Sequence, residues 1–201
     1  MQTIDAKLKS RIYGSGRGSA FTPNDFLDIG RRDAVDKALS RLAVKGTVRR
    51  LARGLDEYPR EHPELGLLSP DIEKVAKALA GKDRIRLQPA GAYATNLLGL
   101  SEQVPAKVVF LTDGPSRTVK IGRQEILLRR TTPRNMAAAA RLSGLLMQAF
   151  RHLGKEHITP ARMEHLKRTF PAKERGLLLK DLRLAPAWMH PLFRELAGEQ
   201  A

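Results

Sequence analysis

The fold is decided by one stretch of the sequence, RDAVDKALSRLAVKGTVRRLARGLDEYP, which spans residues 32–59. Its first half predicts a helix from about Arg32 to Lys45, which Gly46 ends. One face of this helix is apolar, with residues at helical spacing: Val35, Ala38, Leu39 and Leu42. The opposite face carries Asp33, Lys37, Ser40, Arg41 and Val44.

The second half of the stretch predicts a two-stranded hairpin. A short strand over residues 48–51 is followed by a tight turn at residues 52–54, a second strand over residues 55–58, and Pro59. Upstream, Ile4, Leu8 and Ile12 recur every four residues and predict a helix over residues 3–13.

A further helix is expected between these two, from Thr22 as its cap to Gly30, with Pro23 at its first position. Helix, helix, helix and two-stranded wing is the order of a winged helix-turn-helix. We therefore expect a domain of this kind over residues 1–60.

The charged face of the 32–45 helix suits the major groove of DNA, and the wing suits the phosphate backbone. Lys and Arg bond guanine edges or phosphates, and Ser bonds either. The predicted DNA-binding residues are Arg31, Arg32, Lys37, Ser40, Arg41, Arg49, Arg50 and Arg53. Two alternatives to DNA binding remain: a charged helix face is also typical of a solvated surface, and winged helices also serve as protein-interaction modules. In addition, Asp33 or Asp36 could hold an Arg side chain in place so that it does not contact DNA.

The rest of the chain predicts a linker over residues 61–68 and a second domain over residues 69–201. A helix is expected from Ser69, as cap, to Gly81, then a strand over 85–88 and a helix over 90–98. Strand-like runs at 108–111, 118–121 and 126–129 predict an antiparallel meander. A long helix over 134–153 and helices over 160–168, 172–181 and 187–197 follow, with Trp188, Met189 and Phe193 as core residues. The fold class is therefore α+β: a winged helix-turn-helix, then a mixed domain with a small antiparallel sheet and several helices.

The net charge points to polyanions. The chain has 36 Lys and Arg against 21 Asp and Glu, a formal charge of +15, and a basic chain is drawn to nucleic acid, acidic protein or anionic lipid. Lipid is the weakest of these, because no apolar run approaches the roughly 20 residues of a spanning helix. The N-terminal residues lack the order of a signal peptide. Since there is also no Cys, we expect a cytoplasmic protein.

A second basic cluster accompanies the predicted strands of the second domain. It consists of Arg117, Lys120, Arg123, Arg129, Arg130 and Arg134. It predicts another contact with an anionic partner, whether DNA, RNA or an acidic protein surface. The alternative is a basic surface that only keeps the protein soluble.

Several motifs resemble those of the abortive-infection E antitoxin family. They are IYGSGRGSAFTPNDF at residues 12–26, AVDKALSRL at 34–42, RRLARGL at 49–55, KVVFLTDGPSR at 107–117 and RRTTPRN at 129–135. Together they cover most of residues 10–140. The resemblance implies an aromatic residue within residues 55–59, which read Leu-Asp-Glu-Tyr-Pro, and the departure there is the acidic pair Asp56 and Glu57, which could change how the end of the wing contacts DNA.

The resemblance implies an antitoxin of a bacterial type IV toxin–antitoxin system that acts in abortive infection, a phage defence. Such proteins bind inverted repeats in their own promoter and repress the operon. They also counteract a nucleotidyltransferase toxin without needing a stable complex with it. A monomer in solution that binds cooperatively on operator DNA is compatible with this role.

No pattern predicts catalysis, a metal site or a cofactor. Residues 14–18, GSGRG, lack the preceding strand and the Gly-Lys-Ser/Thr ending of a phosphate-binding loop. The histidines show no zinc-ligand spacing, and no Gly-x-Ser-x-Gly elbow occurs. We therefore expect a non-enzymatic protein. The alternatives to a DNA-binding antitoxin are an RNA- or ribosome-associated basic protein and, third, an enzyme such as a nuclease.

Overall fold

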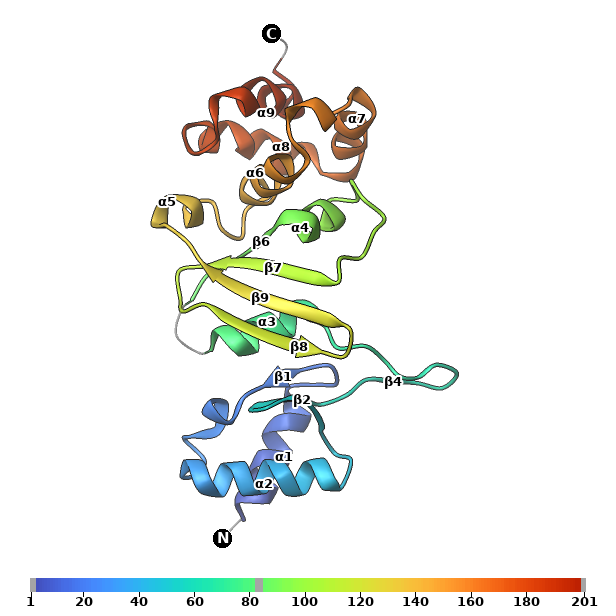
Figure 1. The fold of residues 1–201 in the computed structure, drawn as a ribbon, viewed down its shortest axis with the longest axis vertical. Coiled ribbons are helices and arrows are strands. Elements are labelled where there is room, and N and C mark those ends of the chain that lie inside the picture. Colours follow the sequence, from blue (N-terminus) through green and yellow to red (C-terminus); the bar gives the residue numbers. More distant parts are fainter. Residues whose placement is uncertain (1–2, 82–84, 200–201) are drawn as a thin grey trace. The chain divides into compact units, whose positions relative to one another are not determined.

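The computed structural model describes residues 3–81 and 85–199, and it confirms the α+β fold class (Figure 1). The chain divides into two compact units. The first comprises residues 1–85 with 119–121, and the second comprises residues 86–118 with 122–201. The sequence predicts this division earlier, at a linker over residues 61–68. Each unit is described by itself below.

The first unit begins with α1 (Ile4–Gly14), β1 (Ala20–Phe21) and a 3-10 helix, η1 (Pro23–Phe26). These are followed by α2 (Arg32–Val44), β2 (Arg49–Ala52) and β3 (Leu55–Glu57). The strands form an antiparallel sheet in the order β1-β3-β2. The predicted helices over 3–13 and 32–45 and the hairpin are confirmed. The arrangement is compatible with a winged helix-turn-helix.

The core of this unit explains the arrangement of α1 and α2. Both helices bury the apolar stripe that the sequence showed, with Leu8, Val35 and Leu39 at 0% exposure. The helix expected over 22–30 is wrong, because only a single 3-10 turn forms there. The Asp25 side chain accepts from both the amide and the hydroxyl of Thr22. Phe26 packs edge-on against Phe21, which fixes the turn without a longer helix.

The segment predicted as a linker folds as a hairpin of β4 (Glu61–His62) and β5 (Gly66–Leu67), which pair with each other. It leads to α3 (Ile72–Ala80), which packs against β1. The prediction that Ser69 caps this helix is wrong. Asp71 is the cap, because its carboxylate accepts from the amides of Glu73 and Lys74. Gly81 ends the helix as predicted.

The second unit contains most of a four-stranded sheet in the order β6-β7-β9-β8, of which residues 119–121 are grouped with the first unit. Its strands are β6 (Leu87–Ala90), β7 (Lys107–Thr112), β8 (Arg117–Ile121) and β9 (Gln124–Arg130). The expected meander is wrong. β9 lies between β7 and β8 and pairs with β7 in parallel, from Lys107 opposite Glu125 to Thr112 opposite Arg130. β6 pairs with β7 in the antiparallel sense.

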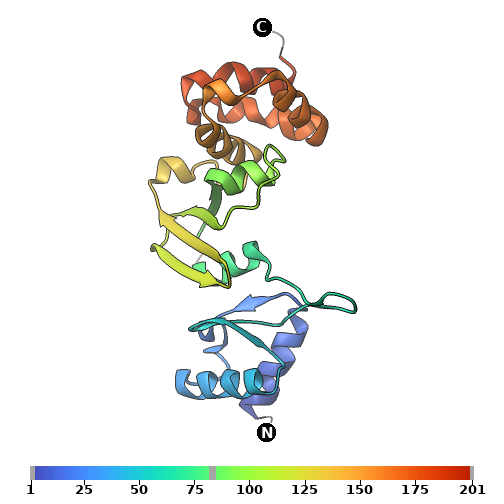
Figure 2. The same ribbon diagram turned by 45° about the vertical axis from the view of Figure 1, so that its right-hand side comes forward.

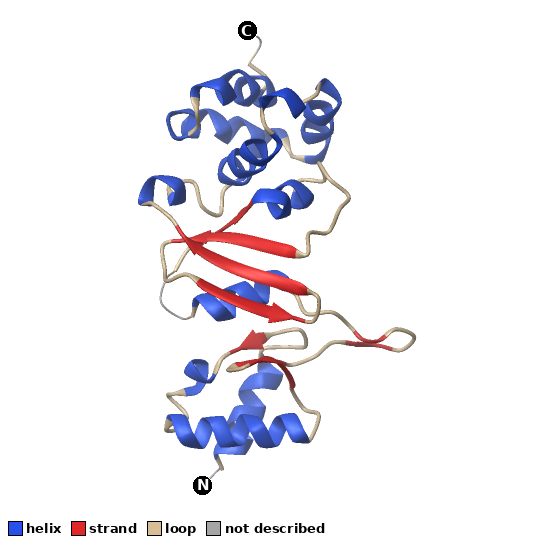
Figure 3. Ribbon diagram, viewed as in Figure 1, coloured by secondary structure: helices blue, strands red, loops and turns tan. Residues whose placement is uncertain are grey.

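Helices complete the second unit (Figures 2 and 3). α4 (Gly91–Leu97) packs against β7 and α6 (Leu142–Leu153). The others are α5 (Pro133–Met136), η2 (Lys155–His157), α7 (Pro160–Thr169), α8 (Ala172–Gly176), η3 (Leu177–Leu184), η4 (Ala187–Met189) and α9 (His190–Ala197). Their core includes Phe150, Met189 and Phe193, each at 0% exposure, with Trp188 packed against it. The prediction that Met189, Phe193 and Trp188 belong to the core is thereby confirmed.

The long helix expected over 134–153 is wrong, because it breaks between α5 and α6. Ala140 has φ +64°, in the left-handed region that a helix cannot contain. Asp181, 5% exposed, holds the chain in place after the break. It accepts from the Arg141 guanidinium at 2.7 Å and from the Ser143 hydroxyl. This tertiary contact leaves no periodic signal in the sequence.

Within the described residues, no helix is long and apolar enough to cross a membrane.

Candidate nucleic-acid interface

The outward face of α2 divides into a central stripe and two flanks. Positions 33, 37, 40 and 44 lie on the side of the helix opposite its buried residues, at 3.6 residues per turn. All four side chains are exposed. In the part of the chain that the structure describes, neither Lys37 nor Ser40 has a side-chain hydrogen bond or an ion pair. Their donors are therefore available to a ligand.

The arginines at the edges of α2 are held by acidic side chains. Arg41 binds Asp5 of α1 through two bonds, from Nε at 2.9 Å and from Nη2 at 2.5 Å. Arg32 donates to Asp36, one turn along the helix, and at 2.7 Å to Asn24. Arg31 occupies the N-cap position of α2 without a capping side-chain hydrogen bond, and its 92% exposed side chain lies 3.8 Å from Asp33.

The Arg41–Asp5 pair is the electrostatic link between the first helix and this face. The hydrogen bond from Arg41 holds the pKa of Asp5 below its ordinary value, although burial works in the opposite direction. The same bond raises the pKa of the Arg41 guanidinium. The pair therefore stays ionised at neutral pH. Sequence reasoning considered Asp33 and Asp36 as partners of arginine and missed Asp5, which lies 36 residues from Arg41.

Two arginines of the wing are also engaged. Arg49 and Arg50 of β2 stand directly across from Glu57 and Asp56 of β3. Arg49 reaches the Glu57 carboxylate at 2.5 Å and donates to the Leu68 carbonyl at 2.8 Å. Arg50 donates to Asp56 at 3.0 Å. Asp56 and Glu57, the acidic pair that the sequence places at the end of the wing, are thus the partners of two predicted DNA-binding residues.

The side chains of Asp56 and Glu57 are buried, each with 1% of its surface exposed. Burial raises the pKa of Asp56, although the bond from Arg50 works against the shift. One of its oxygens, Oδ2, is buried and has no hydrogen-bond partner within residues 3–81 and 85–199. Asp56 is therefore a costly buried carboxylate that depends on Arg50 for compensation.

The tip of the wing differs from its stem. Arg53 is exposed in the turn between β2 and β3, where Gly54 takes φ +70°. Among the described residues it has neither an ion pair nor a side-chain hydrogen bond. Of the predicted residues in the first unit, Lys37, Ser40 and Arg53 are therefore the ones whose polar groups face solvent without an internal partner.

The predicted second cluster is spread over several elements. Arg117 and Lys120 are on β8, Arg123 is in the turn before β9, Arg129 and Arg130 end β9, and Arg134 is on α5. Successive residues of a strand point to opposite faces, so Arg129 and Arg130 do not share one. The sequence could count these charges but not assign them to faces.

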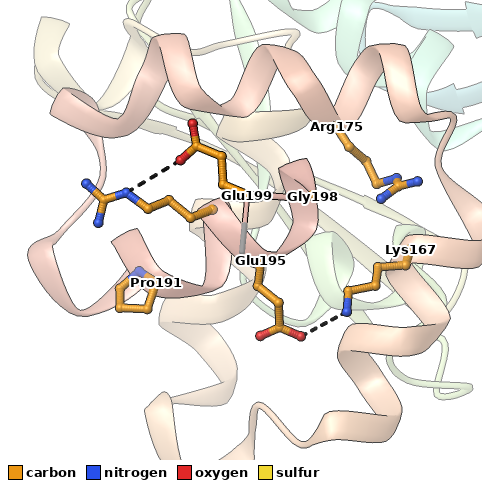
Figure 4. Close-up of a pocket in the computed structure, with 7 residues that line it drawn as sticks. Lys167, Arg175, Pro191, Glu195, Gly198 and Glu199 are labelled. Carbon is orange, nitrogen blue, oxygen red and sulfur yellow. Dashed lines mark ion pairs between the residues drawn. The ribbon is translucent and has the colours of Figure 1, made fainter. Parts of the chain in front are cut away.

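A pocket of about 730 Å³ in the second unit offers a different kind of site (Figure 4). Its charged lining residues pair with one another, Lys167 with Glu195 at 3.1 Å and Arg194 with Glu199 at 3.8 Å. Arg175 donates to the Leu196 carbonyl near the end of α9. The pocket is thus lined by groups that already satisfy each other. The described residues contain no group of three or more His, Cys, Asp or Glu side chains able to hold a metal ion.

Comparison with known proteins gives one family and one similar structure. Residues 4–176 match a family described as "Family of unknown function (DUF6088)". The crystal structure of the RV2827C protein from Mycobacterium tuberculosis is similar at 14% sequence identity, over 100% of this chain and 83% of that chain, with a TM-score of 0.46. Comparison with the curated proteins gives no match.

Proposed function

The chain belongs to the DUF6088 family of unknown function, and we propose that this member is a sequence-specific DNA-binding protein. In this proposal α2 enters the major groove and the tip of the wing contacts the backbone. The protein acts as a repressor of its own operon. The proposal concerns binding and assigns no catalytic role to any residue.

The observation that carries the proposal is the central stripe of α2. Lys37 and Ser40 are exposed, share one helix face and keep their polar groups free among the described residues. Such free donors are suited to hydrogen-bond the edges of bases in the major groove. A side chain that is already bonded to an acidic residue of the protein would first have to break that bond, which costs free energy. Arg53 at the tip of the wing, which also has no internal partner among the described residues, adds a contact with a DNA phosphate.

The arginines with acidic partners take a second role. Arg32, Arg41, Arg49 and Arg50 place positive charge around the stripe, and their partners fix where that charge lies. Specificity then comes from the stripe, and affinity comes from both the stripe and the surrounding charge.

The test is a gel-shift titration of the full chain against duplex DNA from just upstream of its own gene, with excess unrelated DNA as competitor. We expect specific retention, which the double variant Lys37→Ala with Ser40→Ala loses. Lys173→Ala, an exposed lysine in the second unit, serves as the charge-matched control and retains binding. If the double variant binds this DNA as the wild type does, the docking through α2 is wrong. Preference for RNA over duplex DNA in competition would instead support an RNA-associated protein.

We further propose, from the resemblance of residues 10–140, that the protein is the antitoxin of a type IV system. It counteracts a nucleotidyltransferase toxin without forming a stable complex with it, and the operator carries inverted repeats. Co-expression with a nucleotidyltransferase encoded beside its gene tests this role. Rescue of growth by both the wild type and the double α2 variant would separate antitoxicity from DNA binding, and absence of rescue by the wild type would overturn the antitoxin role.

A further inference from the structure

Val44 is an apolar side chain in an unusual place. It is the last residue of α2 and is 90% exposed, the highest value among the exposed large hydrophobic residues of the described chain. Val35, Ala38, Leu39 and Leu42 fill the core on the other side of the same helix. Nothing in the packing of the first unit therefore requires a valine here.

The position of Val44 places it in the central stripe. Residues 37, 40 and 44 are separated by three and four positions, which superimposes them on one helix face. Arg41, which borders the stripe, is drawn away from it by its two bonds to Asp5. The stripe thus presents an ammonium group, a hydroxyl and a branched apolar group in succession from Lys37 to Val44.

Duplex DNA offers one apolar group in the major groove, the C5-methyl of thymine, and apolar side chains recognise it by contact. We propose that Val44 packs on a thymine C5-methyl group, so that α2 reads a thymine at its C-terminal end. This inference rests on the proposed DNA-binding function and adds a specificity-determining residue to it. The contact buries apolar surface equivalent to about one methyl group in total, which corresponds to roughly a fourfold change in affinity.

The experiment removes that methyl group alone. The wild-type chain first selects its preferred duplex from a random pool. Each thymine of that duplex is then replaced singly by deoxyuridine, which lacks only the C5-methyl, and dissociation constants are measured by fluorescence anisotropy at constant salt. We expect one thymine in each half-site at which the replacement weakens wild-type binding about fourfold. Val44→Ala should bind the thymine and deoxyuridine duplexes alike.

Val104→Ala is the matched control, because Val104 is an exposed valine of the second unit at 73% exposure. It should keep the wild-type preference for thymine at the same position. A deoxyuridine penalty that persists unchanged in Val44→Ala, or the absence of any penalty in the wild type, overturns the thymine contact while leaving DNA binding intact. Failure of the wild type to select any sequence overturns the proposed function itself, and the two failures are therefore distinct.

Discussion

At the scale of single residues, Asp5 controls the charge beside α2. Its carboxylate holds Arg41 by two hydrogen bonds and partly neutralises the face that we propose to meet DNA. We expect Asp5→Asn to raise the affinity for duplex DNA about fivefold at low salt, because it removes a negative charge and releases the guanidinium. The measurement is anisotropy against the selected duplex. Asp28→Asn, which removes the acid paired with Arg11, is the control. An equal gain in affinity from this variant would show that the effect comes from the net charge of the protein and not from the release of Arg41.

Asp56 makes stability depend on Arg50 and on pH. The folded pKa of Asp56 is raised, so the folded state binds this proton more tightly than the unfolded chain. Its contribution to stability is full below the unfolded pKa and is lost as pH rises through the folded value. Removing Arg50 raises the pKa of Asp56 further, because the bond that lowers it is gone.

We therefore expect Arg50→Ala to lower the free energy of unfolding by about 1–2 kcal/mol at neutral pH, a value discounted for the half-exposed arginine. The deficit should shrink as the pH falls, because the raised pKa of Asp56 lets this carboxylate become protonated in the variant. Urea unfolding at neutral and at acidic pH measures it. A deficit that is the same at both would show that Asp56 is not the group involved.

The positions of the proposed binding residues on α2 could be predicted from the sequence as far as helical periodicity reaches. The spacing of 3.6 residues per turn placed Lys37, Ser40 and Val44 on one face and the core residues on the other. It could not show that Arg41 meets Asp5 or that Arg50 meets a buried carboxylate. Those partners come from another helix and from the facing strand, so only tertiary structure brings them together.

At the scale of elements, Gly144 fixes how α6 begins. A Cβ at this position would lie 2.1 Å from the Ala138 carbonyl oxygen and 2.7 Å from Oε1 of Gln88. We expect Gly144→Ala to lower the free energy of unfolding by about 3 kcal/mol or more, because a backbone oxygen cannot move aside cheaply. Gly176→Ala is the control.

Gly176 ends α8 with φ −60°, and no atom of a neighbouring residue lies within 4 Å of the place that a Cβ would take. An alanine there should leave stability unchanged or raise it by up to about 1 kcal/mol through helix propensity. Urea unfolding of both variants gives the comparison. Equal stability of Gly144→Ala and the wild type would mean that the turn at residues 137–141 adapts freely.

The elements show where local signals are sufficient. α1, α2, α4 and α7 form close to the ranges that the sequence predicts, and the Thr3 and Thr159 side chains cap α1 and α7. The strand order of the second unit could not be predicted in this way. The local sequence of a strand does not show which strand it pairs with, so the parallel pairing of β7 with β9 leaves no local signal. The break before α6 depends on Asp181, 40 residues from Arg141, and it could not be seen in the local sequence.

At the scale of the whole molecule, positive charge is present along the entire chain. Residues 1–60 contain 13 basic and 7 acidic residues, and residues 61–201 contain 23 and 14. Such an excess of positive charge attracts polyanions of any sequence. Specific and general binding therefore need to be separated by their dependence on salt.

We expect three different responses when the logarithm of the binding constant is plotted against that of the salt concentration. Arg53→Ala should reduce the slope by about 0.9, the value for one lost phosphate contact. Lys37→Ala should relax sequence preference with little change of slope, as expected for a base contact. Lys173→Ala should alter neither. A slope reduced equally by all three variants would assign the binding to general electrostatics.

The pairing of Arg49 with Glu57 and of Arg50 with Asp56 also constrains how the wing can diverge during evolution. The two residues of each pair face each other on the neighbouring strands β2 and β3. A substitution that removes one charge therefore destabilises the wing until a second substitution removes the charge of its partner. Family members should therefore carry these positions as matched pairs, either both charged or both uncharged. Within residues 3–81 and 85–199, Lys37 and Ser40 have no such partner, so the face of α2 that we propose to meet DNA can change in sequence while the wing keeps its shape.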